Sequence, residues 1–400
     1  MAVLDVAMLA SRVAVTAGVI ASILGLGWLD VVRAVTGDLI LIDELLAIAP
    51  ALAFIILTWW SYEPIERRLR EALLWRELHD PAGVPVHPIP SRAVAVWHHT
   101  RHGLLVVVLP LSAILAWSEL IDRVWPEIAA RATAAPAWMG DALHYLGILA
   151  VLIVTPLAIR VVWNTVPIGP GSVRTQALAV AAKYRVRVRG PYLWRTHGST
   201  VNAAILGIVY PLRYMLFTDA LLERLTERQV EGVIAHEVAH VKLRHMLWLA
   251  LVVLACALAF GWVLEAIAPL VHAGPAWDVW GAVLGLGATL FVFGVVSRRF
   301  EWQADAFALR HLSGPSPIAT PDAADCMAGA LGDVAALNGA SPTRFGFRHG
   351  SIHDRQSRLR RLAGAPLDQF PIDRHVRLIK AITLTVLVLA LLTSAAMMLR

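Results

Sequence analysis

The sequence predicts a mainly α-helical protein that is embedded in a membrane. Of its 400 residues, 58% are hydrophobic and only 16% are charged, which is unlike the balance of soluble domains. A bilayer core of about 30 Å needs roughly 20 apolar helical residues to cross it, and runs of about that length recur along the chain. They predict seven transmembrane helices, at 13–29, 45–62, 103–117, 145–162, 247–264, 279–296 and 381–399.

The charges between these runs predict the orientation of the chain. Segment 63–102 is rich in arginine, whereas the loops after the first, third and fifth runs hold few cations or none. Positively charged short loops stay in the cytoplasm, so we expect 63–102, 164–246 and 297–378 to face it. This orientation, together with anionic headgroups nearby, explains the net charge of +6 without a nucleic acid; a specific anionic partner is the alternative.

Cysteine use and composition agree with this placement. The sequence holds two cysteines, and Cys256 lies inside a predicted span, so we expect no disulfide framework and a reducing cytoplasmic face. The first apolar run has no convincing small-residue cleavage site, and we interpret it as a retained anchor. Abundant arginine and alanine beside scarce lysine indicate a GC-rich genome, and so a bacterial inner membrane.

We expect a membrane part and a polar catalytic domain that a hairpin interrupts. The expected segments are four N-terminal spans with the basic loop 63–102 (1–163), the first half of the domain (164–246), the hairpin (247–296), the second half (297–378) and the last span (379–400).

Short patterns within the first half of the domain predict a small β-sheet and a helix. Apolar and basic residues alternate at 184–189, and two further β-like runs follow at 202–209 and 213–217. Thr226 then begins a capping-box pattern, which indicates the start of a helix.

The clearest chemical signal lies on that helix, in the sequence His-Glu-Val-Ala-His at 236–240. His236 and His240 are four residues apart, so both imidazoles lie on one helical face and can reach one ion. Zinc suits such ligands, and Glu237 beside the first of them can accept a proton from a zinc-activated water. Such a motif also arises by chance, but here it lies on a capped amphipathic helix directly before a span.

A catalytic zinc site needs a third ligand and keeps one position open. The sequence Glu-Trp-Gln-Ala-Asp at 301–305 places Glu301 and Asp305 one helical turn apart. Glu301 is the predicted third ligand of one zinc ion per chain. Asp305 is predicted to accept a hydrogen bond from a ligand histidine and so to fix its tautomer. The alternative is that Glu301 only balances Arg298 and Arg299.

The two motifs and the apolar hairpin between them resemble one family of membrane proteases. This family contains the bacterial HtpX-type quality-control proteases and the type I CAAX prenyl proteases, and the resemblance covers roughly residues 180–360. It implies a zincin-type catalytic domain of the gluzincin class that acts on peptides or membrane proteins in a lipid bilayer. The seven predicted spans resemble the prenyl-protease branch, in which helices surround a chamber, more than the four-span HtpX branch.

The same resemblance implies roles for three more residues. His349 to Arg355 is similar to the family's His-Pro-Ser-x-x-x-Arg segment, although Gly350 replaces the proline, and it implies that His349 and Arg355 face the substrate and the oxyanion. Asn202 matches an asparagine on an edge strand beside the active site, where an extended peptide could pair. A basic helix start near headgroups and an ordinary turn asparagine are the alternatives.

Other histidines carry weaker signals. His245 lies five residues after His240, about 140° around a continuous helix, so we expect it to point away from the site into the interface. His98, His99 and His102 flank the third span, and for them headgroup contact is favoured over metal binding.

Together these features predict a zinc-dependent endopeptidase that cleaves peptides or membrane-protein segments at the cytoplasmic surface of the membrane. The alternatives are a transporter or receptor-like bundle with a structural metal, and a degenerate protease that serves as a scaffold or chaperone. Nearly uncharged span centres disfavour the first, and the intact Glu237 disfavours the second. The residues select neither a substrate nor an oligomeric state.

Overall fold

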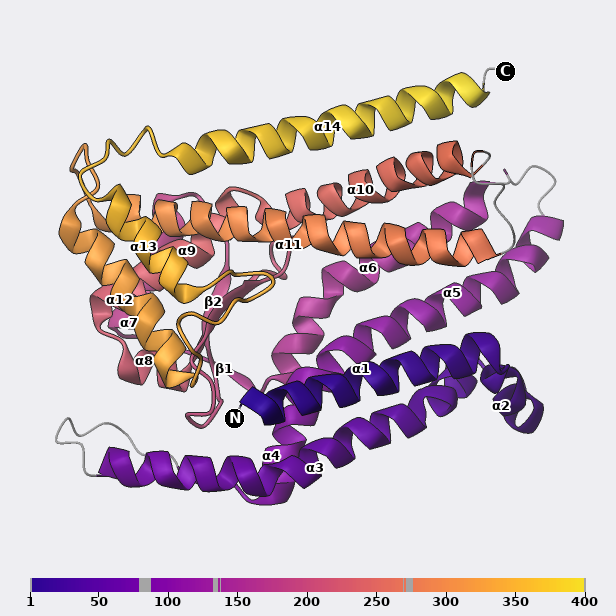
Figure 1. Ribbon diagram of the computed structural model, residues 1–400, viewed down its shortest axis with the longest axis horizontal. Coiled ribbons are helices and arrows are strands. Elements are labelled where there is room, and N and C mark those ends of the chain that lie inside the picture. The colour runs from indigo at the N-terminus through magenta and orange to yellow at the C-terminus, as the bar shows by residue number, and fades with distance from the viewer. Residues whose placement is uncertain are drawn as a thin grey trace. The chain divides into compact units, whose positions relative to one another are not determined.

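The computed structural model describes residues 2–78, 88–131, 138–268 and 276–398, and the single positions 136 and 270. The chain divides into two compact units, Met1–Thr165 and Val166–Arg400, and each is described by itself below. Figure 1 labels the helices and strands in chain order.

The first unit consists of helices, most of them long and apolar. They are α1 (Ala2–Gly25), α2 (Trp28–Thr36), α3 (Ile42–Leu78), α4 (Arg92–His99), the π-helical turn η1 (Thr100–Leu104), α5 (Leu105–Arg131) and α6 (Trp138–Val162). Helices α5 and α6 pack closely, because Gly147 leaves room for the indole of Trp117 where any side chain would collide with it. That indole donates a hydrogen bond to the carbonyl oxygen of Leu143, at 2.9 Å.

The second unit carries the sheet and the remaining helices. Its elements are β1 (Thr165–Pro167), which begins at the boundary, α7 (Ser172–Lys183), β2 (Arg189–Trp194), β3 (Ala203–Leu206), β4 (Tyr214–Thr218), α8 (Asp219–Arg224), α9 (Glu227–Lys242), α10 (His245–Ile267), α11 (Ala276–Leu312), α12 (Pro321–Leu337), α13 (Ile352–Leu362) and α14 (Pro371–Met398).

Six helices among the described residues are long and apolar enough to cross a membrane: Ile42–Arg68, Arg92–Arg131, Trp138–Val162, His245–Ile267, Trp280–Leu312 and Pro371–Thr393. They confirm six of the seven predicted spans. The remaining one, 13–29, falls on two helical pieces, Val13–Ile23 and Trp28–Thr36, that meet at 66°. The break coincides with Gly27, whose φ of 62° is costly for other residues.

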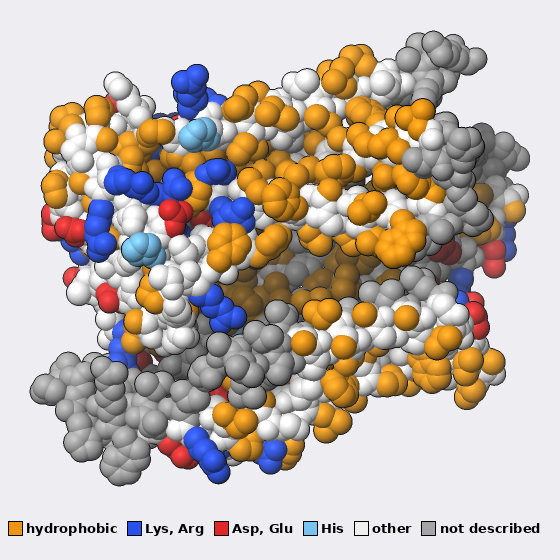
Figure 2. All heavy atoms as spheres, in the orientation of Figure 1, with side chains coloured by type: hydrophobic (Ala, Val, Ile, Leu, Met, Phe, Trp, Pro, Cys, Tyr) orange, Lys and Arg blue, Asp and Glu red, His pale blue; other side chains and the backbone are white. Residues whose placement is uncertain are grey.

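Large apolar side chains cover the outer faces of these helices, as Figure 2 shows for one side of the molecule. In the second unit, Val283, Phe291 and Leu391 are more than half exposed. Such surfaces are costly in water but are suited to lipid. The chain is therefore an integral membrane protein. Most of the turn expected between α10 and α11, and the end of the last span at 399, lie outside the described residues.

The predicted small sheet is present, with four strands in the order β1-β2-β4-β3. Strand β4 is buried along its whole length and pairs in parallel with β2 and antiparallel with β3. Strands β3 and β4 confirm the β-like runs at 202–209 and 213–217. Strand β3 lies at the edge of the sheet, so one side of its backbone is not used in strand pairing.

The strand expected at 184–189 is wrong. Helix α7, which the sequence patterns did not predict, runs up to Lys183, and Tyr184 ends it. Arg185 then takes a φ of 56°, and the Val186 amide donates to the carbonyl oxygen of Ala181 at 2.8 Å, which closes the helix end. The alternation arises because Val186 enters the core while its basic neighbours face outward. Strand β2 begins only at Arg189.

Helix α9 lies at the centre of the second unit and begins as predicted. The Thr226 hydroxyl accepts a hydrogen bond from the amide of Gln229, and the Gln229 side chain accepts one from the amide of Thr226. Further along, Ile234 and Val238 are fully buried. Helix α9 packs against α11, and the fully buried Ala304 and Ala308 on α11 allow a close approach.

The loop before β3 is held by one carboxylate, that of Asp219. It accepts hydrogen bonds from the hydroxyl and amide of Thr196, at 2.5 and 3.0 Å, and from the amide of His197, at 2.7 Å. Burial raises the pKa of Asp219, but the hydrogen bonds from Thr196 and from the backbone outweigh this effect and hold the pKa below its usual value. Ionised Asp219 therefore stabilises the approach to β3.

We expect Asp219→Asn to lower the thermal unfolding midpoint at pH 7, because an amide cannot accept all of these bonds. A depressed folded-state pKa gives stability above the unfolded value of about 4, and this stability is lost as pH falls through the folded value. The difference between variant and parent should therefore shrink as pH falls below about 4. A difference that stays constant with pH, measured by thermal unfolding in detergent, would contradict this role.

Candidate active site

Helices α9 and α11 bring the three predicted metal ligands together. The Nε2 atoms of His236 and His240 lie 3.2 Å apart on one face of α9. On α11, Glu301 places Oε2 at 3.6 Å from Nε2 of His236 and Oε1 at 3.7 Å from Nε2 of His240. Residues that are about sixty positions apart in the sequence thus converge on one point.

The three side chains offer the donor atoms that zinc prefers in proteins, two imidazole nitrogens and a carboxylate oxygen. One ligand atom from each of the three residues lies within 4.8 Å of the other two, close enough for a single ion to bind all three residues. His236 and Glu301 are buried, whereas the side chain of His240 is 23% exposed. The group therefore offers two imidazoles and one carboxylate, and it is accessible from one side.

Asp305 and Arg355 form a buried charged layer behind the ligands. Oδ1 of Asp305 lies 3.0 Å from Nδ1 of His236, which is an ion-pair distance although the ring N–H is not aligned for a hydrogen bond. The guanidinium of Arg355 donates from Nε and from a terminal nitrogen to the two oxygens of Asp305, at 2.8 and 2.6 Å. Its other terminal nitrogen lies 3.4 Å from Oε2 of Glu301. Arg355 is thus enclosed between two carboxylates.

His349 lies at the exposed side of the group. Its Nδ1 is 3.1 Å from Oε1 of Glu301, and its side chain is 54% exposed. The adjacent Gly350 has a φ of 74° and donates its amide to the carbonyl oxygen of Gly346 at 2.8 Å. Proline has no N–H and a φ near −65°, so it could not occupy position 350 in this turn.

Glu237 lies next to His236 on α9 and is partly exposed. Without a metal, desolvation raises its pKa to about 7, although the charge of His236 and a hydrogen bond from the backbone of Ile205 oppose the shift. Burial lowers the pKa of His236, but Asp305 and Glu301 outweigh it and raise the value to about 10. A metal that binds His236 therefore has to displace a proton.

Asn202 lies just before the edge strand β3 and is exposed. Its side-chain oxygen accepts a hydrogen bond from the backbone amide of Ala203, at 2.9 Å. Its backbone amide donates to the hydroxyl of Thr218, also at 2.9 Å. In the described part of the chain, these hydrogen bonds join Asn202 to its own strand pair and do not reach the three ligands. The backbone of the neighbouring Ile205, by contrast, contacts Glu237.

The expectation that His245 points away from the site is wrong. It assumed a continuous helix, but α9 ends at Lys242, Arg244 takes a φ of 58°, and α10 begins at His245. The imidazole of His245 is fully buried, and its Nδ1 lies 3.0 Å from Nδ1 of His240. It also stacks on the ring of Phe300, with centroids 4.5 Å apart. Residues 241–244 include neither glycine nor proline, so the usual sequence signals of a helix break are missing here.

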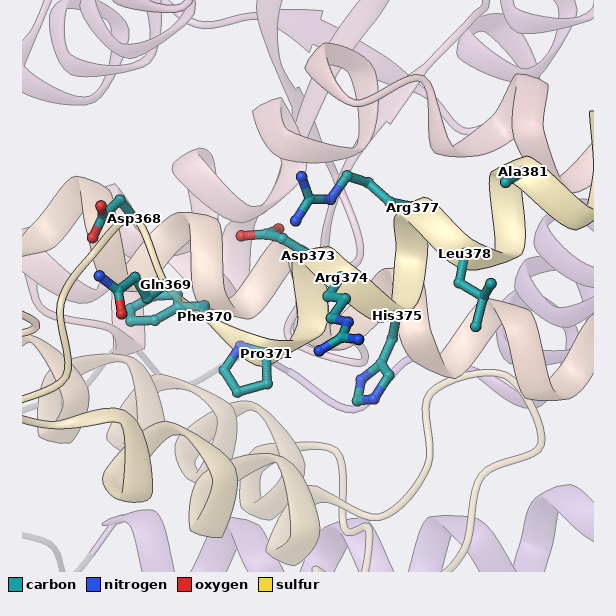
Figure 3. A pocket seen from close by; sticks show the side chains of 10 residues that line it. All are labelled: Asp368, Gln369, Phe370, Pro371, Asp373, Arg374, His375, Arg377, Leu378 and Ala381. Carbon is teal, nitrogen blue, oxygen red and sulfur yellow. The ribbon is translucent and has the colours of Figure 1, made fainter.

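A separate groove of about 1010 Å³ runs along the start of α14 (Figure 3). Asp373, Arg374 and Arg377 line it, and none of the residues that the sequence predicted for the site does. The groove is therefore distinct from the site formed by His236, His240 and Glu301.

The fold and this site together define a membrane metallopeptidase. Residues 171–362 match the model of peptidase family M48, and they include all of the predicted site residues. This confirms the resemblance that the motifs indicated. Among solved structures, the chain is similar to the crystal structure of S. mikatae Ste24p, at 13% sequence identity and a TM-score of 0.44, covering 78% of this chain and 86% of that one. No curated protein matches the chain.

Two arginines on α13 test the buried layer. Arg355→Met should destabilise the metal-free protein by about 3–5 kcal/mol, because it takes a charged partner away from two buried carboxylates. Arg355→Lys keeps the charge but loses the paired hydrogen bonds, so a smaller loss is expected.

The matched control is Arg360→Met on the same helix, because Arg360 forms an exposed ion pair with Asp325. Exposed pairs contribute little, so its unfolding midpoint should stay close to that of the parent. Equal effects of Arg355→Met and Arg360→Met on thermal unfolding would rule out the proposed importance of the buried layer.

Proposed function

We propose that the chain is a zinc-dependent endopeptidase with His236, His240 and Glu301 as metal ligands and Glu237 as general base. The observation that carries the proposal is the convergence of one ligand atom from each of these three residues to within 4.8 Å of one another, with Glu237 on the same helix as the two histidines. Arg355 and Asp305, buried behind the ligands, keep this arrangement in place.

A bound zinc ion would polarise a water molecule and the carbonyl group of the scissile peptide bond. Glu237 takes a proton from the attacking water and passes it to the leaving nitrogen. A pKa near 7 suits both transfers, and the positive charge of a metal would lower it further toward the ionised form that the first transfer needs. The partial exposure of Glu237 gives the substrate access to it.

The oxyanion that forms on the carbonyl needs a positive or hydrogen-bonding partner. His349 is placed for this role, because it touches Glu301 and still exposes more than half of its side chain. Arg355 is nearly enclosed and bonds to Asp305, so it acts chiefly by orienting the carboxylates and by adding positive charge from behind.

The free edge of β3 is the proposed binding place for the substrate backbone. An extended peptide that pairs with this edge gains main-chain hydrogen bonds in any sequence. Ile205 lies within β3 and contacts Glu237 through its backbone, so such a peptide would pass close to the general base. Asn202, at the start of the strand, would lie beside it.

We further propose that the enzyme lies in a bacterial inner membrane with the site toward the cytoplasm. The arginine-rich segment 63–102 supports this orientation. Peptides and segments of membrane proteins are the proposed substrates, because Glu301 lies on the helix that continues from the apolar residues of a span.

Replacement of the general base tests the mechanism. Glu237→Gln should lower the rate of peptide-library cleavage by about 10²–10⁴-fold while the protein keeps its zinc, because the amide cannot take the proton. Glu227→Gln, an exposed position on the same helix, is the control and should cleave as the parent does. Unchanged cleavage by Glu237→Gln, at equal zinc content, would exclude Glu237 as the base.

A further inference from the structure

A chain of polar contacts leads from the metal ligand His240 to the start of α14. Nδ1 of His240 lies 3.0 Å from Nδ1 of His245, and Nε2 of His245 lies 3.0 Å from Oε1 of Gln303. Nε2 of Gln303 then donates to Oδ1 of Asp373 at 2.7 Å. The other oxygen of Asp373 accepts a hydrogen bond from Arg310.

The charge of Asp373 fixes which group donates and which accepts in each of these hydrogen bonds. An ionised carboxylate only accepts hydrogen bonds, so Asp373 requires the amide nitrogen of Gln303 on its side and leaves the amide oxygen toward His245. That oxygen requires a proton on Nε2 of His245. In a neutral imidazole the other nitrogen is then an acceptor, so Nδ1 of His245 faces His240 with its lone pair.

The contact between His245 and His240 determines the tautomer of His240. A lone pair on His245 requires a proton on Nδ1 of His240, and neutral His240 then carries its free lone pair on Nε2. Nε2 is the atom that faces His236 and Glu301. Every donor in the chain therefore meets an acceptor only when His240 is in the tautomer that can bind a metal.

We propose that His245, Gln303 and Asp373 are positioning residues that hold the zinc ligand His240 in its metal-binding tautomer. The proposal rests on the zinc site proposed above. The two histidine ligands are then supported in different ways. Asp305 lies directly against His236. His240 is connected to the carboxylate of Asp373 through two side chains, those of His245 and Gln303.

Burial makes each contact in this series of hydrogen bonds hard to replace. His245 is fully buried and Gln303 is 6% exposed, so water cannot readily replace a missing partner. The ring of Phe300 lies parallel to that of His245, at 7°, and limits its rotation. Gln303 lies two residues after the ligand Glu301, and Asp373 lies in the first turn of α14. Helix α14 is thereby connected by hydrogen bonds to His240, one of the three proposed metal ligands.

Asp373 also lines the groove at the start of α14, where Figure 3 shows its side chain. Its side chain is 29% exposed, more than that of His240, His245 or Gln303, and it forms an ion pair with Arg310. A substitution at Asp373 can therefore be made with little disturbance of the core.

The test measures the zinc dissociation constant of the purified full-length protein by competition with a chelator. His245→Leu and Gln303→Met should each weaken zinc binding by about 10–100-fold, the usual effect of removing a partner of a ligand histidine. His245→Asn can place an oxygen acceptor near the position of Nδ1 and should restore most of the affinity. Asp373→Asn should weaken binding, whereas Asp368→Asn, an exposed carboxylate on the same segment, should not.

Thermal unfolding of the metal-free variants separates positioning from general stability. Wild-type zinc affinity in His245→Leu, Gln303→Met and Asp373→Asn overturns the proposal, and so does a His245→Asn variant that binds as weakly as His245→Leu. If His245→Leu does not fold, Gln303→Met and Asp373→Asn decide by the same criterion. A parent protein that binds no zinc would instead refute the proposed function.

Discussion

The arrangement of the second unit depends on one buried meeting of opposite charges. Glu301 and Asp305 on α11 face His236 on α9 and Arg355 on α13 within a few ångströms, and the four side chains are all buried. Carboxylates in such a place are costly unless each has a partner. The close approach of α9 and α11, which the fully buried Ala304 and Ala308 permit, satisfies this need and also brings the three proposed metal ligands together.

The sequence predicted those parts of the protein whose signal is local and periodic. The spans follow from apolar length, helix α9 from its capping box, and the closeness of the two imidazoles from the four-residue spacing of His236 and His240. Glu301 could be paired with them because its motif follows the apolar hairpin. In each case, a short window of residues carries the physical requirement.

The remaining features depend on backbone conformations that no periodic pattern reports. Arg185 and Arg244 take positive φ values, which are uncommon for residues other than glycine, and each breaks a pattern that looked continuous. The first turns an expected strand into a helix end. The second brings His245 back onto His240, so that a residue expected in the interface becomes the neighbour of a proposed ligand. Gly350 similarly fits a turn that a proline could not adopt.

We propose that two imidazoles and one carboxylate of this chain bind zinc. X-ray absorption at the zinc edge, combined with the metal content of the purified protein, tests it most directly. We expect one zinc per chain, bound only by nitrogen and oxygen at about 2.0–2.2 Å. Zinc at well below one per chain after exposure to excess metal, or a sulfur ligand at about 2.3 Å, would contradict it.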